Sequence, residues 1–549
     1  MNAIEIRQVD FSYGQLNPAA DGAWRLKGIT LGIARGEFVA LLGSNGSGKT
    51  TLLKLCNGLL LPNAGAISVH GADTADQGQL WEIRRRSGMI FADPDSQIIG
   101  TTVIEDVAFG PENLGLPPHV IRENVQDALK ALGLQDFAEA ETQSLSSAQK
   151  FRLALAGVVA MRPDCLLVDQ AATPLAPEDR KEIMALLRTL SRERGLSVVH
   201  VTQDEEEIST ADRVIVLDRG EIALDGTPAQ FFSCKSRFSQ PLSDIPQMTD
   251  RCDAGATETK GEGAGKTPHS RDAGLRPAHL LTDAVGRYCH GDTILHRADP
   301  RTKIALTLLA MAAVYAFRSF PVLPLMLLIT LTLSALSGRP LRHSLRGLRL
   351  VIYLASVAVV ANLVTIKGTP LLDHGILHHI SREAVAKSAT MVFRLALLAS
   401  AASLLTSTTP PFALAAGGEN LLKPLSRIGV PVSRLSTMLL ISLRFLPVIV
   451  EEAAKLIRLQ SAVTADSNLL QRVRSYLPLL VPLLQSVAHR GDAMATAMDA
   501  RCYRTGTART SMRPLGFSRA DLACIGAVAI IMSGLAVADY LTTVLPSMF

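Results

Sequence analysis

Apolar residues are spaced differently in the two halves of this chain. Up to about residue 230, short apolar runs alternate with amphipathic stretches. Strand spacing is found in "NAIEIRQVDFSY", "GEFVALLG", "LSVVHVT" and "RVIVLDRGEIALDG", the last with a turn at its Arg-Gly, and helical spacing in residues 122–132 and 179–192. Strands that alternate with helices predict an α/β domain. After about residue 300, long apolar runs replace this alternation.

The two parts are separated by a stretch of different composition. Residues 235–280 are rich in Gly, Ser, Thr, Asp and Lys and poor in aliphatic side chains. Such a stretch cannot bury enough apolar surface to hold a fold, so we expect a flexible linker. The predicted domains are therefore residues 1–234 and residues 281–549.

The second part contains five apolar segments, at about residues 304–317, 320–337, 350–366, 389–405 and 522–545. A membrane helix needs about 20 mostly apolar residues. The pattern predicts an all-α polytopic membrane domain, and a buried helical core in a soluble protein is the alternative. Arg394 lies inside the fourth segment, and we expect it to be paired within the bundle or near the interface.

Basic residues orient these segments. Arg301 and Lys303 precede the first, four arginines lie in residues 339–349, and residues 410–520 are basic again. Under the positive-inside rule these regions face the cytoplasm. The start of the chain lacks a signal-peptide pattern, so we expect a multi-pass protein of the inner (plasma) membrane with its first domain in the cytoplasm. Residues 410–515 favour amphipathic helices at the membrane surface or against a partner, with ordinary bundle helices as the alternative.

Charge and cysteine content narrow the function classes. A net charge of +5 over 549 residues is mild and gives no reason to expect nucleic acid as a partner. The seven cysteines form no CxxC pair, which is typical of reduced thiols in a cytoplasm-facing protein. Asp373, His374, His378 and His379 cluster in a predicted outer loop; a polar loop is the simpler interpretation and a metal site the alternative.

A nucleotide-binding motif lies between a predicted strand and a predicted helix. The sequence "GSNGSGKT" matches the G-x-x-x-x-G-K-[ST] phosphate-binding loop in its proper context. Its backbone amides and the following helix N-terminus would hold phosphate oxygens of ATP. Lys49 would reach the β- and γ-phosphates, Thr50 and Asp169 would hold Mg²⁺, and Tyr13 would offer a flat surface to the adenine ring. The nucleotide-binding set is Tyr13, Gly43, Ser44, Asn45, Gly46, Ser47, Gly48, Lys49, Thr50 and Thr51.

Several motifs together resemble a known family. "VDFSYG", "GSNGSGKTTLLKLCNGLL", "TVIEDVAFGPENLGLP", "SLSSAQKFRLALAGVVAMRPDCLLVDQ" and "DRVIVLDRGEIALDGTP" resemble the ATP-binding subunit of an ABC transporter, and "FGPENLGLP" resembles its energy-coupling-factor branch. "LHRADPRTKIALTLL", "LLTSTTPP" and "AMDARCYRTG" resemble the transmembrane T component of the same systems. The resemblance covers nearly the whole chain except the linker.

The resemblance implies a role for each half. The ATPase half would act in a dimer, where each ATP lies between one subunit's phosphate loop and the other's signature loop, here with Ser146 and Gln149. T-component helices would transmit ATPase closure to a separate substrate-binding S component for a vitamin or metal ion. Arg501 matches a docking arginine of those helices. The earlier match, "QSAVTAD", has Val463 where the family has the arginine.

The hydrolytic positions depart from the family pattern. Gln170 replaces the catalytic glutamate, Gln203 the switch histidine and Ala92 the Q-loop glutamine, while Ser147 and Ala148 replace the signature glycines and Ala176 the D-loop aspartate. Glutamine cannot accept a proton at neutral pH, and we expect the side chains of Ser147 and Ala148 to crowd the signature loop.

Three functional hypotheses follow from these departures. The leading one is an importer subunit that binds ATP, hydrolyses it poorly and needs a second, intact ABC ATPase. The alternatives are a membrane-anchored ATP-sensing scaffold without transport, and a self-sufficient hydrolase that uses Asp204 or Glu205 as its base.

Overall fold

The computed structural model describes most of the chain. Apart from four isolated positions, the described residues are 2–13, 25–169, 175–234, 298–317, 320–337, 355–366, 381–461, 480–504, 509–512 and 519–544. The predicted linker, the histidine-containing loop at 373–379 and Val463 lie outside them.

The N-terminal domain contains two sheets. One is antiparallel, in the order β2-β1-β4-β5; the other has the order β10-β9-β3-β8-β7-β6 and is parallel except for β10. The strands are β1 (Asn2–Phe11), β2 (Leu26–Ala34), β3 (Phe38–Leu42), β4 (Ala64–Val69), β5 (Ala72–Asp73), β6 (Ser87–Ile90), β7 (Cys165–Val168), β8 (Ser197–Val201), β9 (Arg213–Asp218) and β10 (Glu221–Gly226).

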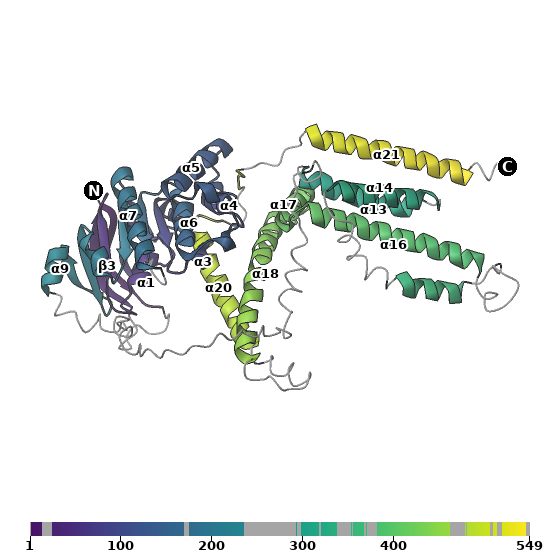
Figure 1. The fold of residues 1–549 in the computed structure, drawn as a ribbon. Helices are drawn as coiled ribbons and strands as arrows, with labels where there is room; N and C mark the ends of the chain where they lie inside the picture. Colours follow the sequence, from purple (N-terminus) through teal and green to yellow (C-terminus); the bar gives the residue numbers. More distant parts are fainter. Residues whose placement is uncertain are drawn as a thin grey trace, which may run out of the picture. The chain divides into compact units, whose positions relative to one another are not determined.

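Helices pack around these sheets (Figure 1). They are α1 (Lys49–Cys56), α2 (Leu80–Arg86), α3 (Pro94–Gln97), α4 (Val103–Asn113), α5 (Pro118–Ala131), α6 (Ser147–Val159), α7 (Pro177–Arg194), α8 (Glu205–Ser209) and α9 (Pro228–Cys234), with short 3₁₀ turns η1 (Gln135–Phe137) and η2 (Thr142–Ser144). The predicted α/β domain is confirmed.

Sequence patterns explain why these strands form. Every residue of β3, "FVALL", is buried, as expected of a central strand in a parallel sheet covered on both faces. Its alternate side chains belong to two separate apolar clusters, with Phe38 in one and Val39 in the other. Between β9 and β10, Arg219 and Gly220 both have positive φ (47° and 85°), which suits a two-residue hairpin. The turn predicted at Arg-Gly is therefore present.

The same compact unit includes a segment from far along the chain. The described residues between 459 and 514 cluster with the N-terminal domain, and helix α20 (Leu480–Ala500) packs against α3 (Figure 1). Ala500 belongs to one of the domain's two apolar clusters and Met512 to the other. The ATPase-like domain thus holds part of the predicted coupling region.

The second unit is helical. Its described helices are α13 (Pro300–Ala316), α14 (Val322–Leu336), α16 (Arg382–Thr408), α17 (Pro411–Leu422), η5 (Lys423–Ile428), α18 (Val432–Ser461, of which residues to 458 belong to this unit) and α21 (Arg519–Val544), with a shorter apolar helix at Ala355–Thr365. Helices α13, α14, α16 and α21 lie side by side (Figure 1). They share a small apolar core that includes Phe317, Leu323, Leu397 and Leu535.

Large apolar side chains elsewhere on these helices are exposed. Leu308, Leu328 and Val537 are each more than half exposed, which is the surface expected of helices that contact lipid. Within the described residues, two helices are long and apolar enough to cross a membrane, Arg382–Thr408 and Asp521–Leu541. These match the fourth and fifth predicted segments; the helices at the first three are shorter, so five complete spans remain a prediction.

Polar contacts hold the ends of these helices together. In "LHRADPRTK", the backbone N–H of Asp299 donates to Asp521 Oδ1 at the start of α21 (2.7 Å), and Lys303 Nζ donates to the carbonyl of Thr408 at the end of α16 (3.2 Å). Arg394 donates to the carbonyl of Phe317 (3.2 Å) and lies over the ring of Tyr315 (5.9 Å). The expected pairing of Arg394 inside the bundle is confirmed.

Candidate functional site

Three motifs meet at one edge of the parallel sheet. The phosphate-binding loop follows β3, Asp169 follows β7, and Gln203 lies just after β8. In the sheet these strands are neighbours in the order β3-β8-β7. Because parallel strands place their carboxyl ends at the same edge, this edge is the expected ligand site of an α/β sheet.

The glycines of the loop are required by its shape. Gly43, Gly46 and Gly48 all have positive φ (148°, 84° and 106°). A Cβ on Gly43 would lie 2.2 Å from the carbonyl oxygen of Leu217, and one on Gly48 would lie 2.7 Å from Leu26 Cδ2. Only glycine allows this backbone to curl so tightly, as an anion-binding loop requires.

The charged groups predicted for ATP and magnesium are brought together. Lys49 Nζ donates to the carbonyls of Gly43 and Ser44 (2.8 Å each). Thr50 Oγ1 donates to Asp169 Oδ1 (3.0 Å). Burial lowers the pKa of Lys49 and raises that of Asp169; the attraction between the two opposes both shifts. Burial thus disfavours the charged form of each side chain. A bound phosphate beside Lys49 and a divalent cation beside Asp169 would stabilise the charged forms.

The side chains around the loop fit a phosphate and Mg²⁺. Ser47 Oγ is buried and has no hydrogen-bond partner among the described residues. It lies in the glycine loop beside the N-terminus of α1, where anions bind. The hydroxyl of Thr50 and the carboxylate of Asp169 are adjacent oxygen ligands of the kind that Mg²⁺ prefers. Asn45 lies in the same loop.

Tyr13 lies beside this loop. Its hydroxyl is 2.9 Å from Thr51 Oγ1, and its ring meets Phe11 edge-on at 5.0 Å. The residue is 62% exposed, so one face remains open to a planar ligand. The structure therefore brings together Tyr13 and Thr51, two residues of the predicted nucleotide-binding set.

The signature loop caps the start of helix α6. Ser146 Oγ accepts the N–H of Gln149 (3.3 Å), and Gln149 Oε1 accepts the N–H of Ser146 (2.9 Å). Of the two residues that replace glycine, Ser147 is exposed and Ala148 is buried at 6%. Only the Ser147 side chain is therefore exposed where a ligand could meet the loop, whereas the Ala148 side chain is buried.

The other replaced positions differ in how exposed they are, where the structure describes them. Gln170 lies outside the described residues, and Gln203 is half-buried between β8 and α8. Ala92 and Ala176 are exposed. Asp204, the alternative base, caps α8 and pairs with Arg180 at 3.0 Å, so its carboxylate already has two donors. These contacts weaken the hypothesis that Asp204 is the base; Glu205 remains the other candidate of the self-sufficient hydrolase hypothesis.

Arg501 occupies a second site in the same unit. Its guanidinium is fully buried, and Nη1 pairs with Asp106 Oδ2 at 3.2 Å. The other oxygen of Asp106 accepts the N–H groups of Ile99 and Gly100 (2.5 and 2.9 Å). Asn113 Nδ2 donates to the carbonyl of Arg501 (3.0 Å). The predicted docking arginine is therefore enclosed by helix α4 and the loop before it.

A glycine of the signature helix makes room for this side chain. A Cβ on Gly157 in α6 would lie 2.8 Å from Arg501 Nη2 and 2.9 Å from its Cζ. Helix α6 begins at the signature loop, ten residues earlier. Arg501 thus rests on the helix that presents Ser146 and Gln149.

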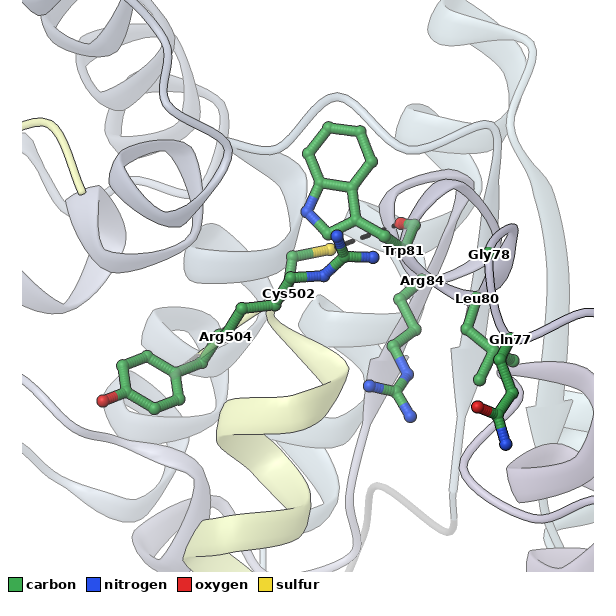
Figure 2. A pocket seen from close by; sticks show the side chains of 8 residues that line it. Gln77, Gly78, Leu80, Trp81, Arg84, Cys502 and Arg504 are labelled. Carbon is green, nitrogen blue, oxygen red and sulfur yellow. Dashed lines mark hydrogen bonds between the residues drawn. The ribbon is translucent and has the colours of Figure 1, made fainter. Parts of the chain in front are cut away.

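Residues 502 and 504 make further contacts with the N-terminal domain. Cys502 Sγ–H donates to the carbonyl of Trp81 (3.6 Å), and the Arg504 guanidinium lies 5.6 Å from the Trp81 ring centre. Trp81, Cys502, Arg504 and Arg84 line a pocket of about 380 Å³. Figure 2 shows these side chains. Burial raises the pKa of the Cys502 thiol to about 12.

Sequence reasoning identified Arg501 but missed its receptor. Asp106, Phe109 and Asn113 lie at i, i+3 and i+7 of α4, which puts them on one helix face. They belong to "EDVAFGPEN", a stretch noted only for its family resemblance. No sequence signal marked this face as the receptor of Arg501, because the burial of Asp106 and its position opposite Arg501 are seen only in the structure. Gly157 carried none, because a helix glycine has no distinctive pattern.

Two family models match separate parts of the chain. Residues 26–173 match the ABC transporter family and residues 291–512 match the cobalt transport protein family, CbiQ. The ATP-binding protein EcfA1 of the energy-coupling factor transporter of Clostridioides difficile is 42% identical over 252 residues, covering 45% of this chain and 89% of that protein. Its counterpart in Symbiobacterium thermophilum is 46% identical over 242 residues, 43% of this chain and 84% of that protein.

Two further similarities concern the whole chain and the ATPase fold. The "Putative ABC transporter ATP-binding protein BL0043" of Bifidobacterium longum is 31% identical over 527 residues, 92% of this chain and 61% of that protein. The solved structure of cbiO1 from Clostridium perfringens, part of the ABC transporter complex cbiONQ, is 34% identical with a TM-score of 0.40, covering 44% of this chain and 96% of that one.

Proposed function

Since this chain belongs to the energy-coupling-factor transporter ATP-binding family and carries a cobalt transport protein domain on the same polypeptide, we propose that it is the ATP-binding and membrane-coupling subunit of an importer. In this role it transmits nucleotide-driven closure to a separate S component for a vitamin or metal ion. The observation that carries the proposal is Arg501, fully buried in the domain that holds Lys49 and Asp169.

The nucleotide in this proposal is ATP with Mg²⁺. Lys49 would hold phosphate oxygens, Thr50 and Asp169 would hold the cation, and Tyr13 would stack on the adenine. ATP supplies a phosphoanhydride bond, and its γ-phosphate would join this chain's loop to the signature loop of a partner domain.

We expect Lys49→Ala to reduce MgATP affinity by at least tenfold, because it removes the buried cation from a site built around phosphate. Equilibrium binding of a fluorescent ATP analogue to the purified full chain measures this. Lys130→Ala on α5, which removes an exposed lysine, is the matched control and should bind as the unaltered chain does. Equal affinity of both variants would contradict the assignment.

The replaced catalytic positions lead to a second part of the proposal. Gln170 and Gln203 would leave the site on this chain's phosphate loop able to bind ATP without cleaving it. A second, intact ABC ATPase subunit would then provide turnover at the other site of the dimer. The lipid bilayer would be the remaining partner. The T-like domain would lie in the inner (plasma) membrane as a multi-pass bundle, with the ATPase half in the cytoplasm.

Affinity purification of the full chain from its native membrane tests the partner assignments. The proposal expects two co-purifying proteins, a small polytopic membrane protein and an ABC ATPase with glutamate and histidine at the positions of Gln170 and Gln203. Mass spectrometry identifies both. Recovery of the chain alone under gentle detergent would favour the ATP-sensing scaffold instead.

A further inference from the structure

The segment that follows Arg501 makes its own set of contacts with helix α4. The described residues 503, 504 and 509–512, which we call the strap, include four side chains that contact α4 or the apolar cluster beneath it, beyond the Arg501 site. Tyr503 stacks on Phe109 with ring centres 6.2 Å apart and planes inclined by 17°. The Arg509 guanidinium lies 4.5 Å from the centre of the same Phe109 ring.

Glu112 is the polar centre of these contacts. Its carboxylate pairs with Arg509 Nη2 at 2.6 Å and accepts the backbone N–H of Met512 at 2.8 Å. The hydroxyl of Thr510 donates to the Glu112 carbonyl (3.4 Å). The Glu112 side chain is only 14% exposed, so these interactions are partly shielded from water.

The end of the strap is anchored by apolar packing. Met512 is 4% exposed and belongs to the same apolar cluster as Val107 of α4 and Phe151 of α6. Asp106, Phe109, Glu112 and Asn113 therefore form one continuous receptor on α4, with Arg501 at one end and Met512 at the other.

The chain contains a natural comparison for this receptor in its earlier coupling segment, residues 460–474. Aligned on Val463 and Arg501, the earlier segment has Ala465 in place of Tyr503, Gln471 in place of Arg509 and Arg474 in place of Met512. Three of the strap contacts would therefore be missing: the ring, the cation and the apolar anchor.

We propose that the strap is a second docking element, and that Phe109 and Glu112 make this ATPase half select the 497–512 segment over the earlier one. This inference rests on the proposed function, in which both segments dock on ATPases. The ATPase half would then recognise Arg501, Tyr503, Arg509 and Met512 together rather than Arg501 alone. This would keep the 497–512 segment on the ATPase half of the same chain and leave residues 460–474 to the second ATPase.

Hydrogen–deuterium exchange of the full chain tests the strap without nucleotide, partner or transport. Arg509→Gln should speed exchange in peptides that contain Tyr503 or residues 509–512 by about tenfold, because it removes both a partly shielded ion pair and a cation–π contact. Glu112→Gln removes the ion pair alone and should speed the same exchange by about threefold. Arg509→Lys should not restore protection, because a lysine cannot stack and pair in the same geometry. Glu123→Gln, which removes an exposed acid of α5, is the control and should change nothing.

The triple variant Tyr503→Ala, Arg509→Gln, Met512→Arg tests whether the strap is needed for docking. It gives the strap the residues of the earlier segment at these three positions and keeps Arg501. It should expose Cys502 to alkylation about as readily as Arg501→Ala does. Alkylation of Cys502 as slow as in the unaltered chain, or unchanged exchange in Glu112→Gln and Arg509→Gln, would overturn the proposal. Neither measurement depends on an S component or a second ATPase, so failure of the importer assignment would be seen separately.

Discussion

The purified chain alone should bind MgATP and hydrolyse it slowly, and the variant Gln170→Glu, Gln203→His should hydrolyse it about 10²–10⁴ times faster. A glutamate at position 170 can accept a proton from the attacking water, which glutamine cannot do at neutral pH. A histidine at position 203 can carry charge beside the phosphate. The predicted magnesium ligands that this reaction would use are already adjacent, since Thr50 Oγ1 and Asp169 Oδ1 are 3.0 Å apart.

Steady-state phosphate release measures this prediction, and two further variants assign its cause. Adding Lys49→Ala to the double variant should remove the gained activity, because the phosphate-binding cation is lost. Adding Ser147→Gly should increase it, since Ser147 is the exposed one of the two signature replacements, whereas Ala148→Gly should have little effect because Ala148 is buried. Fast turnover by the unaltered chain, abolished by Lys49→Ala, would show that another base completes the reaction.

How much the sequence predicted depends on how local each feature is. The phosphate-binding loop was predictable residue by residue, because its glycines and Lys49 act within eight positions of one another. The β9–β10 turn was predictable for the same reason. Asp169 could be assigned because a buried strand that ends in an acid has few other uses beside such a loop.

The receptor for Arg501 could not be predicted, because it depends on pairing across almost four hundred positions. Nothing near Arg501 indicates that Asp106 would face it, or that Gly157 would leave space for its guanidinium. The two side chains of the signature loop also differ for a tertiary reason, since Ala148 faces the domain core and Ser147 does not. Patterns of spacing show which face of a helix is buried, but not which distant segment buries it.

Arg501→Ala should release the coupling segment from the ATPase half, with an expected cost of about 3–5 kcal/mol. The substitution leaves the Asp106 carboxylate buried without its cation, and an uncompensated buried charge is among the largest single-residue penalties known. Asp106 would keep its bonds from the N–H groups of Ile99 and Gly100, so the loop before α4 should stay folded.

Alkylation of Cys502 reports this release directly. In the docked segment the thiol is 2% exposed and burial raises its pKa to about 12, so almost no thiolate is present at pH 8. Once released, the thiol should return towards its ordinary pKa and react at least one hundred times faster, about the ratio that 3 kcal/mol implies. Cys56 and Cys165, buried in the domain core, should stay unreactive, and their modification would mean that the domain had unfolded instead.

Gly157→Ala should separate docking from folding, because we expect it to stabilise helix α6 and to weaken the docking of Arg501. Alanine in the interior of helix α6 favours the helix by about 1 kcal/mol over glycine. Its Cβ would lie 2.8 Å from Arg501 Nη2, so the guanidinium must move away from Asp106. We expect an unchanged or higher melting temperature together with faster Cys502 alkylation. If alkylation stays slow in Gly157→Ala and in Arg501→Ala, the Arg501–Asp106 contact does not hold the two segments together.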